Sequence, residues 1–175
     1  VLALASDSLG LTSPGYTESE TTVEGMINTI VSKSTGVIYF TTVSSNISRM
    51  QQALDVALDN GRKVCFIGRS IIRKTDIAKK LGYLNYPRHL VVRTNEARKL
   101  PKDKVMYVIS GSYGQPGSAL YRVAMGEHDS LSVSENDTVI FSADPAPPGA
   151  KVNVDFLVDR LLEGNIDVHY YDMQE

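Results

Sequence analysis

Cysteine and tryptophan are almost absent from this sequence, and it contains no long hydrophobic run. The chain has one cysteine and no tryptophan among its 175 residues. A single cysteine cannot form an intramolecular disulfide, and Cys65 lies in the apolar run 64–67, so we predict a buried strand residue in a cytoplasmic protein. No apolar stretch approaches the ~20 residues that a membrane-spanning helix needs. The composition therefore argues against a disulfide scaffold and against a membrane protein.

Histidine is also scarce, which limits the chemistry that this chain can carry. His89, His128 and His169 are far apart and show neither H-x-H nor H-x-x-x-H spacing. No serine lies in the G-x-S-x-G motif of a nucleophile elbow, and the G-x-x-x-x-G-K-[ST] motif is missing. The sequence thus predicts that this chain binds no metal and holds neither a nucleophilic triad nor a nucleoside triphosphatase site.

Strand-like and helix-like segments alternate along the whole chain. Short apolar runs predict strands at 2–5, 37–41, 64–67, 90–92, 105–110, 138–142 and 167–170. Apolar residues at helical spacing predict helices around 23–31, 47–58, 72–81 and 154–162. Such alternation is typical of an α/β fold with a mostly parallel sheet and helices on both faces. With no internal linker visible, we predict a single domain over residues 1–175.

Four short polar or glycine-containing turns each follow a predicted strand. They lie at 6–8, 44–46, 68–70 and 111–116. Parallel sheets usually bind ligands at the carboxyl ends of their strands, where such turns meet. Backbone N–H groups, hydroxyls and arginines suit a phosphate-rich ligand. The candidate phosphate-binding residues are Ser45, Asn46, Arg49, Arg69, Ser70, Gly111 and Ser112.

Each turn also has an ordinary structural interpretation. Ser45 and Asn46 are common helix N-caps. The glycines at 111–117 allow a close backbone approach, but the G-x-G-x-x-G spacing of a dinucleotide loop is missing. Asp7 can cap its own turn, or it can orient a histidine or a metal.

The charge of the chain is unevenly distributed. Residues 45–104 contain 14 Lys/Arg against 5 Asp/Glu, a local net charge of +9, whereas the whole chain carries −2. A basic centre indicates a surface for a polyanion. The alternative is a solvated helix face, which Arg73, Lys74, Lys79 and Lys80 would line.

Taken in chain order, the turns and their flanking segments resemble one family. The segments are 6–8, 14–20, 45–52, 61–64, 68–70, 81–84, 95–96, 100–101, 111–116 and 119–122. They are similar to the β-CASP domain of the ribonuclease J family over nearly the whole chain. The sequence departs from the family pattern at Leu9-Gly10, in place of the usual Thr-Asn, and at Gln115, in place of a frequent Glu.

The resemblance implies a Rossmann-like β-CASP domain, a piece of a longer protein in which it is inserted into a metallo-β-lactamase fold. Asp7 matches the acid of β-CASP motif A, which would orient a catalytic-site histidine. The parent would be a homo-oligomeric ribonuclease with two zinc ions, acting on single-stranded RNA as a 5′-to-3′ exonuclease and endonuclease in RNA decay and maturation. The zinc ligands of that family are missing here, so this chain alone would bind no zinc and be inactive. Its expected role is to hold RNA beside the metallo-β-lactamase domain.

Two other functions remain open from the residues themselves. A doubly wound domain with the glycine loop at 111–117 could bind a nucleotide or a sugar phosphate. Alternatively, the apolar ends at 1–5 and 168–171 could pair with other chains, as in a non-catalytic assembly module.

Overall fold

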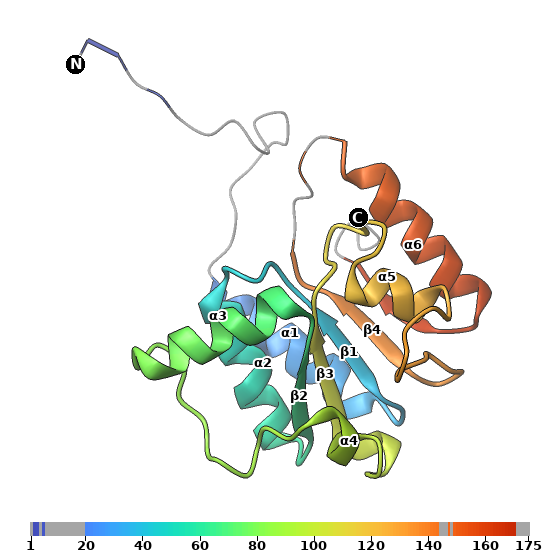
Figure 1. The fold of residues 1–175 in the computed structure, drawn as a ribbon, viewed down its shortest axis with the longest axis horizontal. Helices are drawn as coiled ribbons and strands as arrows, with labels where there is room; N and C mark the ends of the chain where they lie inside the picture. Colours follow the sequence, from blue (N-terminus) through green and yellow to red (C-terminus); the bar gives the residue numbers. More distant parts are fainter. Residues whose placement is uncertain (1, 4, 6–19, 144–146, 148, 171–175) are drawn as a thin grey trace.

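A parallel sheet lies at the centre of the computed structural model, which describes residues 2, 3, 5, 20–143, 147 and 149–170. The five strands of this described part are β1 (Ile38–Thr41), β2 (Lys63–Ile67), β3 (Val105–Ile109), β4 (Thr138–Phe141) and β5 (Asp167–His169). They are all parallel and follow the order β2-β3-β1-β4-β5. The predicted α/β class is confirmed (Figure 1).

Helices cover both faces of this sheet. They are α1 (Glu20–Lys33), α2 (Ile47–Asp59), α3 (Arg69–Lys80), α4 (Thr94–Ala97), α5 (Ala119–Ala124) and α6 (Lys151–Glu163), with a 3-10 turn at Lys102–Lys104. The apolar residues of α1, α2 and α3 pack in one core cluster, and those of α4, α5 and α6 pack in another. Within the described residues, every helix is too short or too polar to cross a bilayer.

The strands are apolar on both faces because both faces are covered. In β1, Ile38 and Phe40 belong to the cluster of α1–α3, whereas Tyr39 between them belongs to the cluster of α4–α6. All five residues of β3 are buried. Cys65 is buried in β2, as predicted, and burial raises the pKa of its thiol.

Two predicted strands differ from the structure. Residues 90–92 form only one parallel bridge, Val91 to Val64, supported by hydrogen bonds from Val64 N to Leu90 O and from Val92 N to Val64 O. The prediction for 2–5 is wrong at the positions described: residues 2, 3 and 5 lie in no strand, and Leu2 is fully exposed. An apolar run forms a strand only where another strand offers its backbone for pairing, and these residues pair with none in the described part of the chain.

Candidate functional site

The first four strands of the sheet end level with one another. Thr41 of β1 is in register with Ile109 of β3 and with Phe141 of β4, and Ile67 of β2 is in register with Ile109. The segments that follow these strands therefore meet along one edge of the sheet (Figure 1).

We call the segments 42–49, 68–70, 110–118 and 142–143 the carboxyl edge. This edge contains every predicted phosphate-binding residue: Ser45, Asn46, Arg49, Arg69, Ser70, Gly111 and Ser112. Three of the four predicted turns, at 44–46, 68–70 and 111–116, therefore lie at this one edge, and the fourth, at 6–8, lies outside the described residues. Asp7 lies outside the described residues.

Asn46 caps helix α2. Its side-chain Oδ1 accepts a hydrogen bond from the backbone N–H of Arg49 at 2.9 Å. The capping interpretation of this turn therefore holds for Asn46, whose carbonyl oxygen is engaged inside the protein. Ser45, one residue earlier, has an exposed side chain that faces solvent.

Arg49 is built into the carboxyl edge. Its side chain is only 9% exposed, and its Nη1 donates a hydrogen bond to the Oγ of Ser142 at 2.6 Å. Two further hydrogen bonds join the end of β1 to the end of β4: Thr42 Oγ1 donates to Ser142 O, and Ser142 N donates to Thr41 O. Arg49 thus connects the first turn of α2 to the end of β4.

The turn between β2 and α3 is the most open part of the carboxyl edge. Gly68 has φ +106°, and a Cβ at this position would lie 2.1 Å from the Oγ of Ser110, so only glycine fits. Arg69 and Ser70 follow it in the first turn of α3 and are both exposed. Among the described residues no side chain caps this helix start. The partial positive charge of this uncapped helix start, beside the exposed Arg69 and Ser70, suits an anion.

The glycine loop is closed by the protein itself. A Cβ on Gly111 would lie 2.5 Å from the Oγ of Ser118, and one on Gly114 would lie 2.3 Å from the backbone oxygen of Asn153 in α6. Ser112 is buried, and Ser118 caps α5 by accepting a hydrogen bond from Tyr121 N. The close backbone approach expected for a ligand is thus made to α5 and α6 instead.

One polar residue directly beside the carboxyl edge was not identified as a site residue from the sequence. Thr41 ends the central strand β1 and is fully buried, yet its Oγ1 has no hydrogen-bond partner among the described residues. Such a group is costly unless water or a ligand reaches it. The only sequence signal was a hydroxyl residue at the end of an otherwise apolar strand.

Histidine and carboxylate groups do not gather into a metal site in the part of the chain that the structure describes. His169 contacts Asp167 on β5, with 3.0 Å between Nε2 and Oδ2. His128 lies in the loop after α5, where burial and the nearby Arg122 lower its pKa. His89 is exposed.

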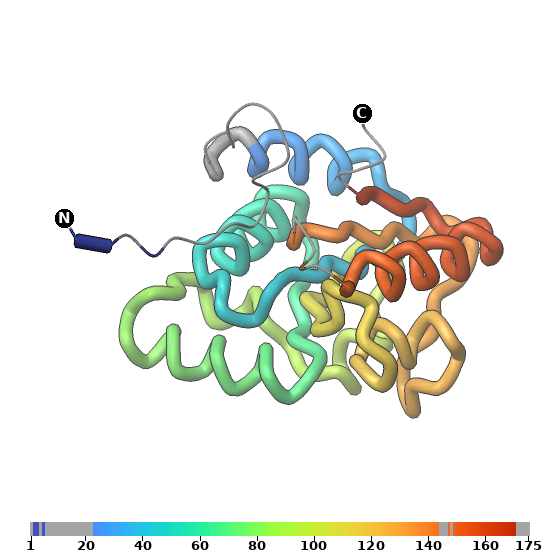
Figure 2. The backbone as a smooth tube through the Cα atoms, turned by 90° about the horizontal axis from the view of Figure 1, so that it is seen from above, coloured from blue at the N-terminus to red at the C-terminus, as the bar shows by residue number. Residues whose placement is uncertain are grey.

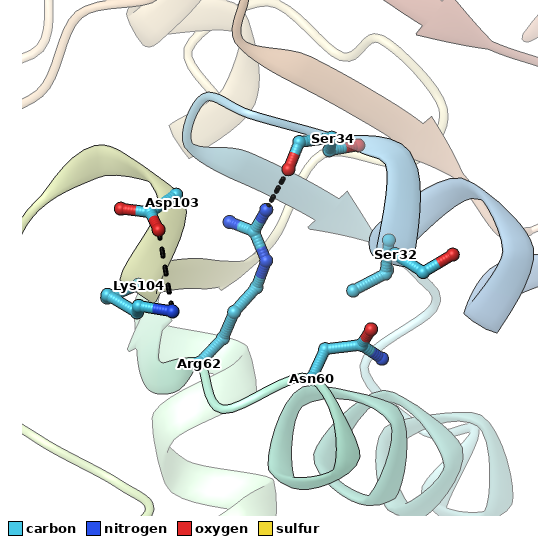
Figure 3. Close-up of a pocket in the computed structure, with 7 residues that line it drawn as sticks. Ser32, Ser34, Asn60, Arg62, Asp103 and Lys104 are labelled. Carbon is cyan, nitrogen blue, oxygen red and sulfur yellow. Dashed lines mark hydrogen bonds and ion pairs between the residues drawn. The ribbon is translucent and has the colours of Figure 1, made fainter.

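A polar pocket of about 150 Å³ lies at the opposite, amino edge of the sheet (Figure 3). Arg62 is buried there, and its guanidinium donates hydrogen bonds to backbone oxygens of Ser34, Gly36, Lys102 and Val105. Burial lowers the pKa of Arg62, opposed by the nearby charge of Asp103. Since its donors are engaged by the backbone, Arg62 joins α1, the sheet and the 3-10 turn.

Comparison with known proteins identifies the family. A family model described as "Ribonuclease J, beta-CASP domain" matches residues 35–161. Ribonuclease J of Helicobacter pylori (strain J99) is 37% identical over 172 residues, which cover 98% of this chain and 25% of the relative. Ribonuclease J of Synechocystis sp. is 36% identical over 170 residues, and Ribonuclease J2 of Bacillus subtilis is 36% identical over 168 residues.

The fold and the polar carboxyl edge define an α/β domain, and the family model assigns that domain to the β-CASP class. The match over more than half of its length shows that this chain belongs to the ribonuclease J family, as the sequence motifs indicated. It spans about a quarter to a third of the length of these relatives.

Proposed function

We propose that this chain is the RNA-binding β-CASP domain of a cytoplasmic ribonuclease that acts on single-stranded RNA in decay and maturation, as a 5′-to-3′ exonuclease and endonuclease. The relatives named Ribonuclease J support this reading. The observation that carries it is the turn at Gly68, where exposed Arg69 and Ser70 flank the uncapped start of α3. Fork-shaped guanidinium groups and free N–H groups both suit RNA phosphates.

The residues of the carboxyl edge divide into two groups in this proposal. Ser45, Arg69 and Ser70 are exposed and contact phosphates directly. Arg49 is mostly buried, Asn46 has its Oδ1 engaged and Ser112 is buried beside Gly111, so these residues hold the edge in shape. A nucleotide-binding module is less favoured, because the glycine loop packs on α5 and α6 and the relatives are ribonucleases.

Hydrolysis itself belongs to the parent protein. The two zinc ions, a metallo-β-lactamase domain and the homo-oligomeric state are part of the proposal, with Asp7 orienting a histidine near the metal. The described residues do not fit zinc, because no group of three or more His, Cys, Asp or Glu among them could hold the ion. We therefore expect this chain alone to leave RNA intact.

The test is a fluorescence-anisotropy titration of this chain with 5′-monophosphorylated single-stranded RNA at several salt concentrations. Binding should weaken with salt, and Arg69→Ala should lower the salt slope by about 0.7, the value for one lost phosphate contact on a single strand. Lys33→Ala, at the exposed end of α1, serves as the control. Absence of binding, or equal binding by Arg69→Ala and the wild type, would count against the proposed role, as would hydrolysis that persists in zinc-free, contaminant-controlled samples.

A further inference from the structure

Helix α3 carries an unusually basic outer face. Its exposed cations include Arg69, Arg73 and Lys80, spaced four and seven residues apart. At 3.6 residues per turn, this spacing places them along one line. The buried side of the helix, formed by Ile71, Thr75 and Ala78, lies opposite this line.

The cations on this line form no ion pair with any residue that the structure describes. No salt bridge of Arg69, Arg73 or Lys80 occurs within the described residues, whereas Arg122 and Arg160 elsewhere each pair with a carboxylate. Asp76, the one acidic residue of α3, is exposed near the same line, three residues after Arg73 and four before Lys80. The line therefore carries three cations against one carboxylate, a net positive charge.

Exposed apolar and aromatic groups flank the same helix. Tyr83, just beyond its end, is 71% exposed, and Leu81 is 66% exposed. Nearby, the ammonium of Lys79 lies 3.7 Å from the ring centroid of Tyr86. Positive charge interleaved with exposed aromatic rings is the combination on which single-stranded nucleic acids bind, by phosphate contacts and base stacking.

The position of α3 makes this face continuous with the carboxyl edge. The helix begins directly after Gly68 and runs away from the edge for about 18 Å, as expected for its 12 residues. It lies on the outside of the molecule, with α2 between it and α1 (Figure 2).

We propose that the outer face of α3, with Arg73, Lys80 and Tyr83, is a second RNA-binding surface that extends the carboxyl edge. It binds the backbone of a single strand beyond the nucleotides held at Arg69, and Tyr83 stacks on a base. This inference rests on the proposed function, since it assigns the surface that binds the next nucleotides of the RNA held at the carboxyl edge. Charge complementarity selects RNA over an apolar partner.

The experiment compares an RNA of about 15 nucleotides, near the upper site size of single-strand-binding domains, with adenosine 5′-monophosphate, which can occupy only one position. The double variant Arg73→Ala/Lys80→Ala should weaken RNA binding and lower its salt slope by about 1.4, or two phosphate contacts. Its affinity for the mononucleotide should stay unchanged. The charge-matched control Arg98→Ala/Lys99→Ala, on exposed residues after α4, should behave like the wild type.

Stacking has its own test in Tyr83. Tyr83→Ala should weaken RNA binding at least about fivefold, whereas Tyr83→Phe, which keeps the ring, should retain it. Because Tyr83 is exposed, neither change should affect folding.

Each other outcome overturns the inference. If the α3 double variant binds RNA like the wild type while Arg69→Ala is weakened, the carboxyl edge acts alone and the proposed function stands. An equal loss of RNA affinity in the control variant Arg98→Ala/Lys99→Ala would mean that RNA binding depends on the total charge of the chain and not on α3. Competition by polyglutamate as strong as that by RNA would assign α3 to an acidic protein partner. Failure of the wild type to bind any RNA would remove the proposed function together with the inference.

Discussion

Arg49 and Ser142 are 93 positions apart in sequence, and a hydrogen bond of 2.6 Å joins the guanidinium Nη1 of the first to the hydroxyl of the second. Arg49 lies in the first turn of α2, and Ser142 directly follows β4. The bond therefore fixes two segments of the carboxyl edge relative to each other. An arginine that a sequence pattern predicts to bind phosphate can thus instead hold together the segments that form the site.

Replacing Arg49 by alanine should destabilise the fold by about 1–3 kcal/mol, because a mostly buried charge-assisted hydrogen bond is lost. Ser142→Ala should cost less, since the guanidinium can turn toward solvent. Urea unfolding of both variants measures the difference. If Arg49→Ala leaves the free energy of unfolding unchanged but weakens RNA binding, Arg49 contacts RNA itself.

Gly68→Ala should destabilise the chain more than Gly82→Ala does. Both glycines have a positive φ, so each alanine suffers the strain of the left-handed region. Only at Gly68 does the new Cβ also meet a neighbour, the Ser110 Oγ at 2.1 Å, whereas Gly82 has open space. Thermal unfolding of the two variants isolates the clash. Adding Ser110→Gly to Gly68→Ala should restore part of the loss, and no restoration would show that strain alone explains it.

Arg62→Lys should destabilise the fold by about 3 kcal/mol although the charge is kept. Arg62 serves four backbone oxygens at once through its two terminal nitrogens, and a single ammonium cannot reach them all. Chemical unfolding should show the loss, with Lys63→Arg, on the next and less buried residue, as the control. A stable Arg62→Lys variant would mean that water in the adjacent pocket replaces the missing donors.

The sheet, four of the helices and the gathering of the turns could be predicted from local pattern. Apolar periodicity reports burial, and parallel strands bring their carboxyl ends together whatever their order. The run 2–5 shows the limit of that signal, because an apolar run does not reveal which strand it pairs with. The strand order β2-β3-β1-β4-β5 could not be predicted either, since it depends on contacts between distant segments.

The roles of single site residues were harder to predict for the same reason. Gly114 looked free to approach a ligand, but Asn153, 39 positions away, occupies that space. Arg62 belongs to the basic stretch 45–104 of the sequence, but it is buried and donates hydrogen bonds to backbone oxygens in the segments 34–36 and 102–105. Residue type predicted the chemistry of each turn, and only the fold decides whether that chemistry faces solvent or the protein itself.

Stability should fall as the pH rises above 10, through Tyr107. Burial, with smaller contributions from Cys65 and Asp137, raises the pKa of Tyr107 from 10.0 to about 12. Between these values the unfolded chain releases the phenol proton and the folded chain keeps it. The unfolded state therefore binds fewer protons, and the free energy of unfolding decreases by up to about 1.4 kcal/mol per pH unit.

Urea unfolding from about pH 9 to pH 12 should show this decline in the free energy of unfolding. Tyr107→Phe removes the group and should flatten part of it, leaving a residual fall from Tyr39, whose pKa is also raised by burial. An identical decline in the variant would assign the effect to other groups.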